Sequence, residues 1–192
     1  MRVLVVDESD ERAALLREAL TAAGHEVTAS LSSPIELLHA VDAQRPDVIV
    51  IDTESPTRDV LEHVVIVSQS SPRPIVMFSS DAGGAAIRDA VRAGVSAYVV
   101  DGLDAARVSS IVEVACARFE EFQKLKTELA EATLKLSERK LVERAKGLLM
   151  KQRGLSEDEA YHALRKLAMS KKARLGEVAQ QLIDAADLLG KT

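Results

Sequence analysis

The stretch Asp47-Val48-Ile49-Val50-Ile51-Asp52 decides the fold of the first half of this chain. Its four central residues are apolar and β-branched on consecutive positions, which is typical of a strand buried on both faces, as in a parallel sheet. Three further runs share this character, and one is a weaker candidate for an edge strand. The three are Val3–Val6, Ile75–Phe78 and Ala97–Val100, and the edge candidate is His25–Ala29.

Amphipathic stretches separate these runs, at Asp10–Ala23, Pro34–Gln44, Val60–Ser68 and Ala85–Ala93. Strands that alternate with helices in this order predict an α/β fold, a doubly wound five-stranded parallel sheet with right-handed crossovers. We expect this domain to occupy residues 1–105.

Composition excludes several classes of protein. The single cysteine, Cys116, rules out an intrachain disulfide framework and indicates a reducing compartment. No apolar run approaches the roughly 18 residues that span a bilayer, and Asp7 follows the start too soon for a signal peptide. We therefore expect a cytoplasmic protein without a membrane segment.

The second half of the chain is predicted to be helical throughout. An apolar seam steps by three and four residues through Phe122, Leu125, Leu129, Ala132 and Leu136. This seam favours a coiled-coil connector over residues 106–137 that forms a homodimer, although a helix packed on its own domain gives the same pattern. Residues 138–190 then contain three amphipathic segments, the second starting at a capping box of Ser156 and Glu159, which predicts an all-α three-helix unit.

Charge divides the chain in a similar way. The net charge of −5 combines −10 over residues 1–134 with +5 over residues 135–192. Between Arg139 and Arg174, 11 lysines and arginines face only 4 acids. This excess indicates a domain that meets a polyanion, although a solvated helical surface would look similar.

Polar residues follow the predicted strands at Asp7-Glu8, Asp52, Ser79-Ser80 and Asp101. The carboxyl ends of parallel strands meet at one edge of the sheet, where ligands of such folds bind. Asp7, Glu8 and Asp52 together could hold Mg²⁺, and one of them could accept a phosphoryl group. The alternative is a set of solvated loop acids, and no cofactor is required by the sequence.

With these residues in place, residues 1–105 resemble a response-regulator receiver of the CheY or flavodoxin type. The resemblance implies an acidic pocket of Asp7, Glu8, Asp52, Ser79 and Asp101, with Asp52 as phosphoacceptor and Ser79 and Tyr98 as switch residues. Receivers carry a lysine where this chain has Asp101. A like charge at 4 Å costs on the order of 4 kcal/mol at an effective dielectric of 20, so we expect Asp52 to be a poorly used phosphosite.

Residues 143–151, 154–161, 164–170 and 178–179 resemble the ANTAR domain. This resemblance implies binding to paired stem-loops with hexanucleotide loops in nascent leader RNA, and transcription antitermination. The residues proposed to bind RNA are Lys140, Arg144, Lys146, Gly147, Lys151, Arg153, Tyr161, Arg165, Lys166, Lys171, Lys172 and Arg174.

Four residues of this region need an interpretation of their own. Tyr161 either stacks on an unpaired base or fills the three-helix core. Gly147 lowers helix propensity by roughly 1 kcal/mol relative to Ala, so its presence requires a reason. Met150 and Met169 are interpreted as core residues.

The combination of receiver, coiled helix and ANTAR domain is similar to the NasT-like nitrate/nitrite-assimilation antiterminators. The matching stretches in the receiver are residues 46–56, 73–78 and 94–100. The similarity implies control through sequestration by a nitrate/nitrite-sensing protein rather than through phosphorylation. The alternatives are a DNA-binding response regulator and a phosphorylation-dependent one. An enzyme is disfavoured because no nucleophile–base pair or nucleotide-binding loop is visible.

Overall fold

The computed structural model describes residues 1–100 and 105–189. They divide into two compact units, 1–123 and 124–192. No described helix combines the length and the apolar character needed to cross a membrane.

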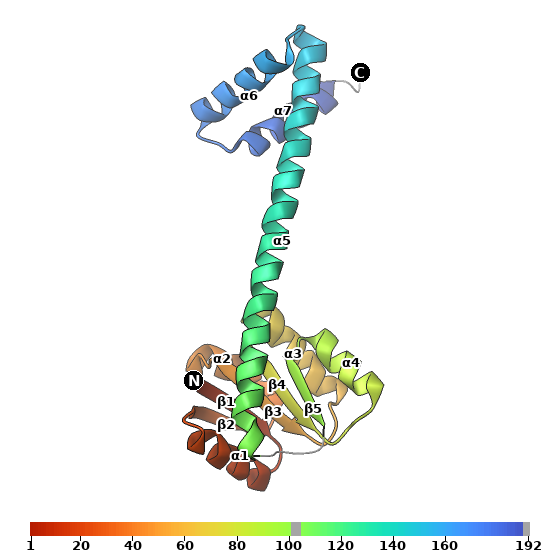
Figure 1. Cartoon of the computed structure of the whole chain (residues 1–192). Helices are drawn as coiled ribbons and strands as arrows, with labels where there is room; N and C mark the ends of the chain where they lie inside the picture. Colours follow the sequence, from red (N-terminus) through yellow and green to blue (C-terminus); the bar gives the residue numbers. More distant parts are fainter. Residues whose placement is uncertain (101–104, 190–192) are drawn as a thin grey trace. The chain divides into compact units, whose positions relative to one another are not determined.

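The first unit is the predicted α/β domain (Figure 1). Its elements in chain order are β1 (Arg2–Asp7), α1 (Asp10–Ala22), β2 (Glu26–Leu31), the short 3₁₀ helix η1 (Pro34–Glu36), α2 (Leu37–Gln44), β3 (Val48–Thr53), α3 (Arg58–Ser70), β4 (Ile75–Ser79), α4 (Gly84–Ala93) and β5 (Ala97–Val100). The strands pair in parallel in the order β2-β1-β3-β4-β5. The fold predicted from the alternating runs is confirmed.

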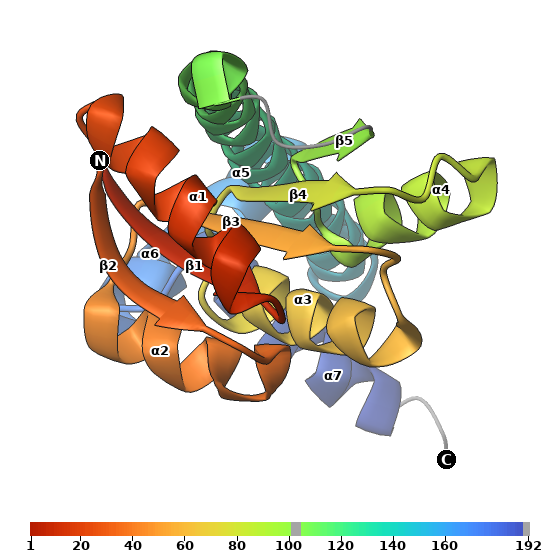
Figure 2. The same cartoon turned by 90° about the horizontal axis from the view of Figure 1, so that it is seen from below.

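Both faces of the sheet are covered, as Figure 2 shows. On one face Leu4, Ile49 and Met77 pack against α2, α3 and α4. On the other face Val5 and Phe78 pack against α1 and the start of α5 (Ala105–Arg153). Burial on both sides explains why the strands are continuously apolar.

The register of the strands places polar residues of neighbouring strands side by side. Asp7 pairs with Asp52 across β1 and β3, and Thr53 pairs with Ser79 across β3 and β4. The ends of three strands therefore bring these polar side chains to one edge of the sheet.

The predicted separate connector over residues 106–137 requires correction. Val108, Val112 and Ala115 of α5 are fully buried in the core of the first unit. The first turns of this helix therefore belong to the α/β domain, because they cover the sheet face beside α1. The helix also continues through Gly147 and stops before Gly154, whose φ of 68° lies in the left-handed region.

The second unit is the predicted three-helix unit. The later part of α5 packs with α6 (Glu157–Lys171) and α7 (Leu175–Leu189) around Ala145, Leu149, Leu164, Val178 and Ile183. The predicted capping box is present: the Glu159 backbone N–H donates to Ser156 Oγ, and the Ser156 backbone N–H donates to the Glu159 carboxylate.

Candidate functional site

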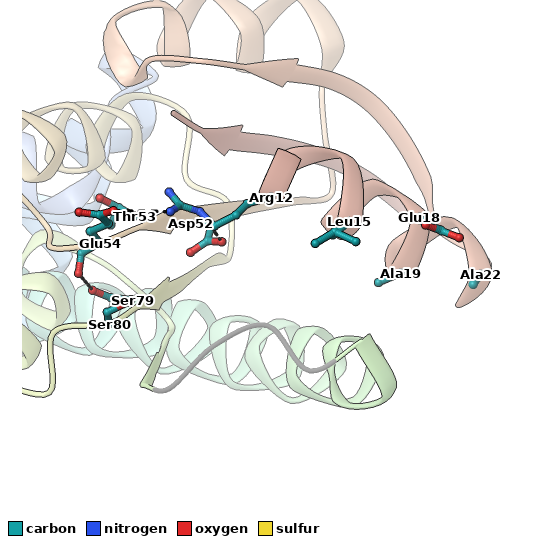
Figure 3. A pocket seen from close by; sticks show the side chains of 10 residues that line it. All are labelled: Arg12, Leu15, Glu18, Ala19, Ala22, Asp52, Thr53, Glu54, Ser79 and Ser80. Atoms are coloured by element: carbon teal, nitrogen blue, oxygen red, sulfur yellow. Dashed lines mark hydrogen bonds and ion pairs between the residues drawn. The ribbon is translucent and has the colours of Figure 1, made fainter. Parts of the chain in front are cut away.

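The strand-end carboxylates of the first unit are held by an arginine that the sequence prediction did not include. Arg12, in the first turn of α1, places Nη2 3.1 Å from Asp7 Oδ1 and Nε 3.5 Å from Asp52 Oδ2. Its Nη1 lies 3.9 Å from the exposed Glu54. Figure 3 shows Arg12 pointing to Asp52.

The predicted metal-binding set of Asp7, Glu8 and Asp52 does not assemble. Asp7 and Asp52 come together, but Glu8 is exposed, and the described residues contain no group of three acidic, histidine or cysteine side chains placed to hold a metal ion. Glu8 lies beyond the end of β1, and a guanidinium already contacts the other two carboxylates. These residues do not fit the Mg²⁺ ion that the sequence allowed.

The Asp52 carboxyl group keeps a raised pKa despite its contact with Arg12. Burial first, and then the negative charge of Asp7, raise the pKa of Asp52 above its ordinary value, and Arg12 offsets this only in part. Asp7 Oδ2 and the Arg12 Nε–H are buried without a hydrogen-bond partner among the described residues. The contact between Arg12 Nε and Asp52 is therefore an ion pair without a hydrogen bond.

The predicted switch residues Ser79 and Tyr98 meet at Asp81, which the sequence prediction missed. Ser79 Oγ accepts the Asp81 N–H at 3.1 Å and donates to the Glu54 carbonyl at 3.0 Å. The Tyr98 hydroxyl donates to the Asp81 carbonyl at 2.8 Å. The Asp81 carboxylate accepts from Ser55 Oγ and the Gly83 N–H. Asp81 thus ties the loops after β3 and β4 to β5.

A cavity of about 430 Å³ opens beside the acidic pocket (Figure 3). One end is lined by Arg12, Asp52 and Ser79, and the other by the α1 side chains Leu15 and Ala19. Asp101, predicted to reverse the charge beside Asp52, lies outside the described residues, so its effect stays a prediction.

The residues predicted to bind RNA lie in the second unit, and most are exposed. The exposed members are Lys140, Arg144, Gly147, Lys151, Arg153, Tyr161, Arg165, Lys166, Lys171, Lys172 and Arg174. We call this set the basic surface. Within this set, Arg144 forms an ion pair with Asp187 at 3.1 Å, and Lys171 Nζ donates a hydrogen bond to Gln181 Oε1 at 3.0 Å.

Lys146 does not belong to the basic surface, contrary to the prediction. It is only 7% exposed, and its Nζ lies 2.7 Å from Glu157 and 2.9 Å from Glu143. Hydrogen bonds to Glu157 and then to Glu143 raise the pKa of Lys146. The residue therefore joins α5 to the start of α6. Its spacing could have shown this, because Lys146 follows Val142 by four residues and precedes Leu149 by three, on the apolar stripe.

Tyr161 and the two methionines are more exposed than a core assignment allows. Tyr161 is 40% exposed and meets His162 edge to face, with ring centroids 6.3 Å apart. The assignment of Met150 and Met169 to the core was wrong, since they are 40% and 72% exposed. The core of this unit is instead filled by leucine, valine, isoleucine and alanine.

Gly147 has no packing role within the described residues. It is exposed, and a Cβ added there would meet nothing within 4 Å. Packing within the described residues therefore does not explain why this position is a glycine. The seam residues Leu125, Leu129 and Leu136 are also all more than half exposed.

The α/β unit is that of a response regulator. A family model for the response regulator receiver domain matches residues 3–113, more than half of the chain, so the chain belongs to this family. A second model, for the ANTAR domain, matches residues 130–183. The protein is thus a response regulator that carries a receiver and an ANTAR domain.

Two curated relatives extend this assignment. The chain is 28% identical to the transcriptional regulatory protein PdtaR of Mycobacterium tuberculosis, over 95% of this chain and 89% of that protein. It is 46% identical to the nitrate regulatory protein of Klebsiella oxytoca over 63 residues, which are 33% of this chain and 16% of that protein.

A solved structure shows the same receiver fold. The signal receiver domain of a modulated diguanylate cyclase from Desulfovibrio desulfuricans matches with a TM-score of 0.55 at 22% identity, over 62% of this chain and 95% of that one.

Proposed function

We propose that this protein is a cytoplasmic antitermination regulator that binds paired stem-loops of leader RNA through its ANTAR domain. The observation that carries the proposal is Gly147, an exposed glycine with free space around it on a helix that also presents Lys140, Arg144 and Lys151. Cations next to a position without a side chain let a phosphate backbone approach the helix closely. The exposed Tyr161 supplies a ring on which a loop base can stack.

RNA is favoured over duplex DNA by the charges of α7. A three-residue turn joins α6 to α7, as in a helix-turn-helix, so α7 would be the helix in the major groove. Yet α7 contains three acids, Glu177, Asp184 and Asp187, and no lysine or arginine. A helix of that charge is repelled by phosphates and is a poor reader of the groove.

The exposed seam of α5 supports a homodimer. Leu125, Leu129 and Leu136 recur at intervals of four and seven residues, so they share one face of the helix. In a parallel pair Glu121 of one copy faces Lys126 of the other, which is attractive, while Lys135 faces Lys140. That second contact is repulsive, and a bound polyanion would relieve it. Dimerisation and RNA binding would then support each other.

The regulated genes, in this proposal, are those of nitrate/nitrite assimilation, and the signal arrives through a nitrate/nitrite-sensing protein that sequesters the regulator. Similarity to the nitrate regulatory protein over 63 residues supports the first part. The pairing of Asp52 with Arg12 supports control by a partner rather than by phosphorylation. An Asp52→Asn protein is then expected to be released from the sensor normally, and acetyl phosphate is expected to label wild-type Asp52 negligibly.

A filter-binding comparison tests the RNA proposal. The probes are an RNA with two hexanucleotide stem-loops and the duplex DNA of the same sequence. We expect preference for the RNA, and a loss of roughly a hundredfold in the Lys140→Glu/Lys151→Glu protein that shrinks as salt rises. Lys124→Glu, an exposed α5 lysine outside the ANTAR match and outside the Glu121–Lys126 contact, is the control for one such charge reversal. Preferential duplex binding, or an equal loss in the control, would contradict the proposal.

A further inference from the structure

One guanidinium serves carboxylates from two strand ends. Arg12 of α1 contacts Asp7 at the end of β1, Asp52 in β3 and Glu54 just after β3. Asp7 is 2% exposed and the Asp52 side chain is 13% exposed. A buried and a partly buried carboxylate, aligned by the strand register, therefore share a cation from their own chain.

We propose that Arg12 is the resident counter-ion of Asp7 and Asp52, and that it makes the receiver pocket unable to take up a divalent cation. The pocket is then insensitive to Mg²⁺ and keeps one electrostatic state. This proposal concerns the first unit alone and does not depend on RNA binding by the second.

Coulomb energies decide between the two cations. An ion that bridges Asp7 and Asp52 has to lie near the guanidinium, which is within 3.5 Å of both carboxylates. Like charges this close repel each other strongly in a half-buried pocket, and the repulsion is twice as large for a divalent ion as for a monovalent one. Glu8, which would otherwise add a third carboxylate, is exposed. The guanidinium, attached to the chain, loses no translational freedom on binding, whereas a free ion does.

The local structure holds Arg12 in this place. Ser9 caps α1, and its Oγ accepts the Arg12 backbone N–H at 3.4 Å. Asp7 Oδ1 accepts both the Ser9 N–H at 2.8 Å and Arg12 Nη2 at 3.1 Å. Leu16 and Leu20, fully buried, fix the same helix on the sheet. The counter-ion is therefore preorganised by the β1–α1 junction.

Metal titration of the full chain without RNA tests the proposal. Mg²⁺ and Mn²⁺ are titrated by calorimetry into the wild-type protein, Arg12→Gln and Arg17→Gln, and thermal midpoints are recorded in EDTA and in Mg²⁺. Arg17 is an exposed arginine of the same helix and serves as the matched control. We expect no saturable binding in wild type or Arg17→Gln. Arg12→Gln should bind Mn²⁺ with a Kd at least tenfold below the weakest Kd that the titration detects. Its thermal midpoint should be higher in Mg²⁺ than in EDTA.

Each outcome decides the proposal. Saturable binding by the wild-type protein at the Arg12→Gln affinity overturns it, and that measurement needs no variant to fold. Folded Arg12→Gln that binds no ion also overturns it, because the arginine would then not be what excludes the metal. If circular dichroism shows Arg12→Gln to be unfolded, Arg12→Met, which also removes the charge, replaces it. Failure of Arg12→Met to raise Mn²⁺ affinity counts against the proposal in the same way.

Discussion

The receiver and the ANTAR domain each contain one cation held by carboxylates, but burial is reversed between them. In the receiver the side chains of Asp7 and Asp52 are 0% and 13% exposed, and the Arg12 side chain is 38% exposed. In the ANTAR domain the Lys146 side chain is 9% exposed, whereas Glu143 and Glu157 are 56% and 69% exposed. The receiver buries anions, and the ANTAR domain buries a cation.

This reversal teaches which partner each domain needs. Removing the exposed member of an ion pair leaves the buried charge without a partner and without water. Removing the buried member leaves only charges that water already solvates. The receiver should therefore lose stability when its cation is removed, and the ANTAR domain should lose stability when its carboxylates are removed. The four predictions below test that contrast.

The largest effect is expected for Arg12→Gln in EDTA. Removing one partner of a fully buried pair costs about 3–5 kcal/mol, and the exposure of Arg12 reduces the expected loss in receiver stability to about 2 kcal/mol. Adding Asp52→Asn should restore most of it, because the second buried charge is gone. Hydrogen exchange of receiver peptides measures both changes, and a double variant as unstable as Arg12→Gln would speak against charge as the cause.

A smaller loss is expected for Glu157→Gln in the ANTAR domain. Lys146 keeps Glu143 as a partner at 2.9 Å, so its ammonium is only partly deprived of countercharge. Hydrogen exchange of α5 and α6 peptides should speed up while receiver peptides stay unchanged. Asp158→Gln, a neighbouring exposed acid, is the control. An equal effect in both variants would show that only the charge of the first turn matters.

Acidification should move the two domains in opposite directions. The raised pKa of Asp52 means that its charge destabilises the fold, so this group adds stability as pH falls through its folded pKa toward the ordinary value of 3.8. The lowered pKa values of Glu157, beside Lys146, and Glu159, bonded to Ser156, mean stability that is lost below pH 4.5. Exchange rates between pH 7 and 4 measure each domain separately. If exchange in receiver peptides, corrected for pH, became faster as pH fell from 7 to 4.5, the predicted gain in stability from Asp52 would be contradicted.

The smallest effect is expected for Lys146→Met. The thioether side chain fills the space of the lysine stem, and Glu143 and Glu157 are exposed enough to remain solvated. Stability should change less than in Glu157→Gln, and RNA affinity should stay within about twofold because Lys146 is not on the basic surface. Lys151→Met, by contrast, should weaken RNA binding. A loss in Lys146→Met equal to that in Lys151→Met would return Lys146 to the set of RNA contacts.

The pairing of Asp7 with Asp52 could be predicted because both follow buried parallel strands, and such strands end at one edge. Arg12 could not, because its role depends on how the β1–α1 turn directs a long side chain back toward the strands. A cation three residues after the N-cap Ser9 was the available signal. In the ANTAR domain, counting charges placed Lys146 with the RNA contacts, since composition does not distinguish the two faces of a helix.

The amino-acid sequence by itself determined the order of strands and helices, both domains and the concentration of cations in the second one. Hydrophobic periodicity and charge are local along the chain, so they can be read without a fold. Only the tertiary structure decided which charges are buried together, because Coulomb energy depends on distance and desolvation, and these are set when β1, β3 and α1, or α5 and α6, come into contact.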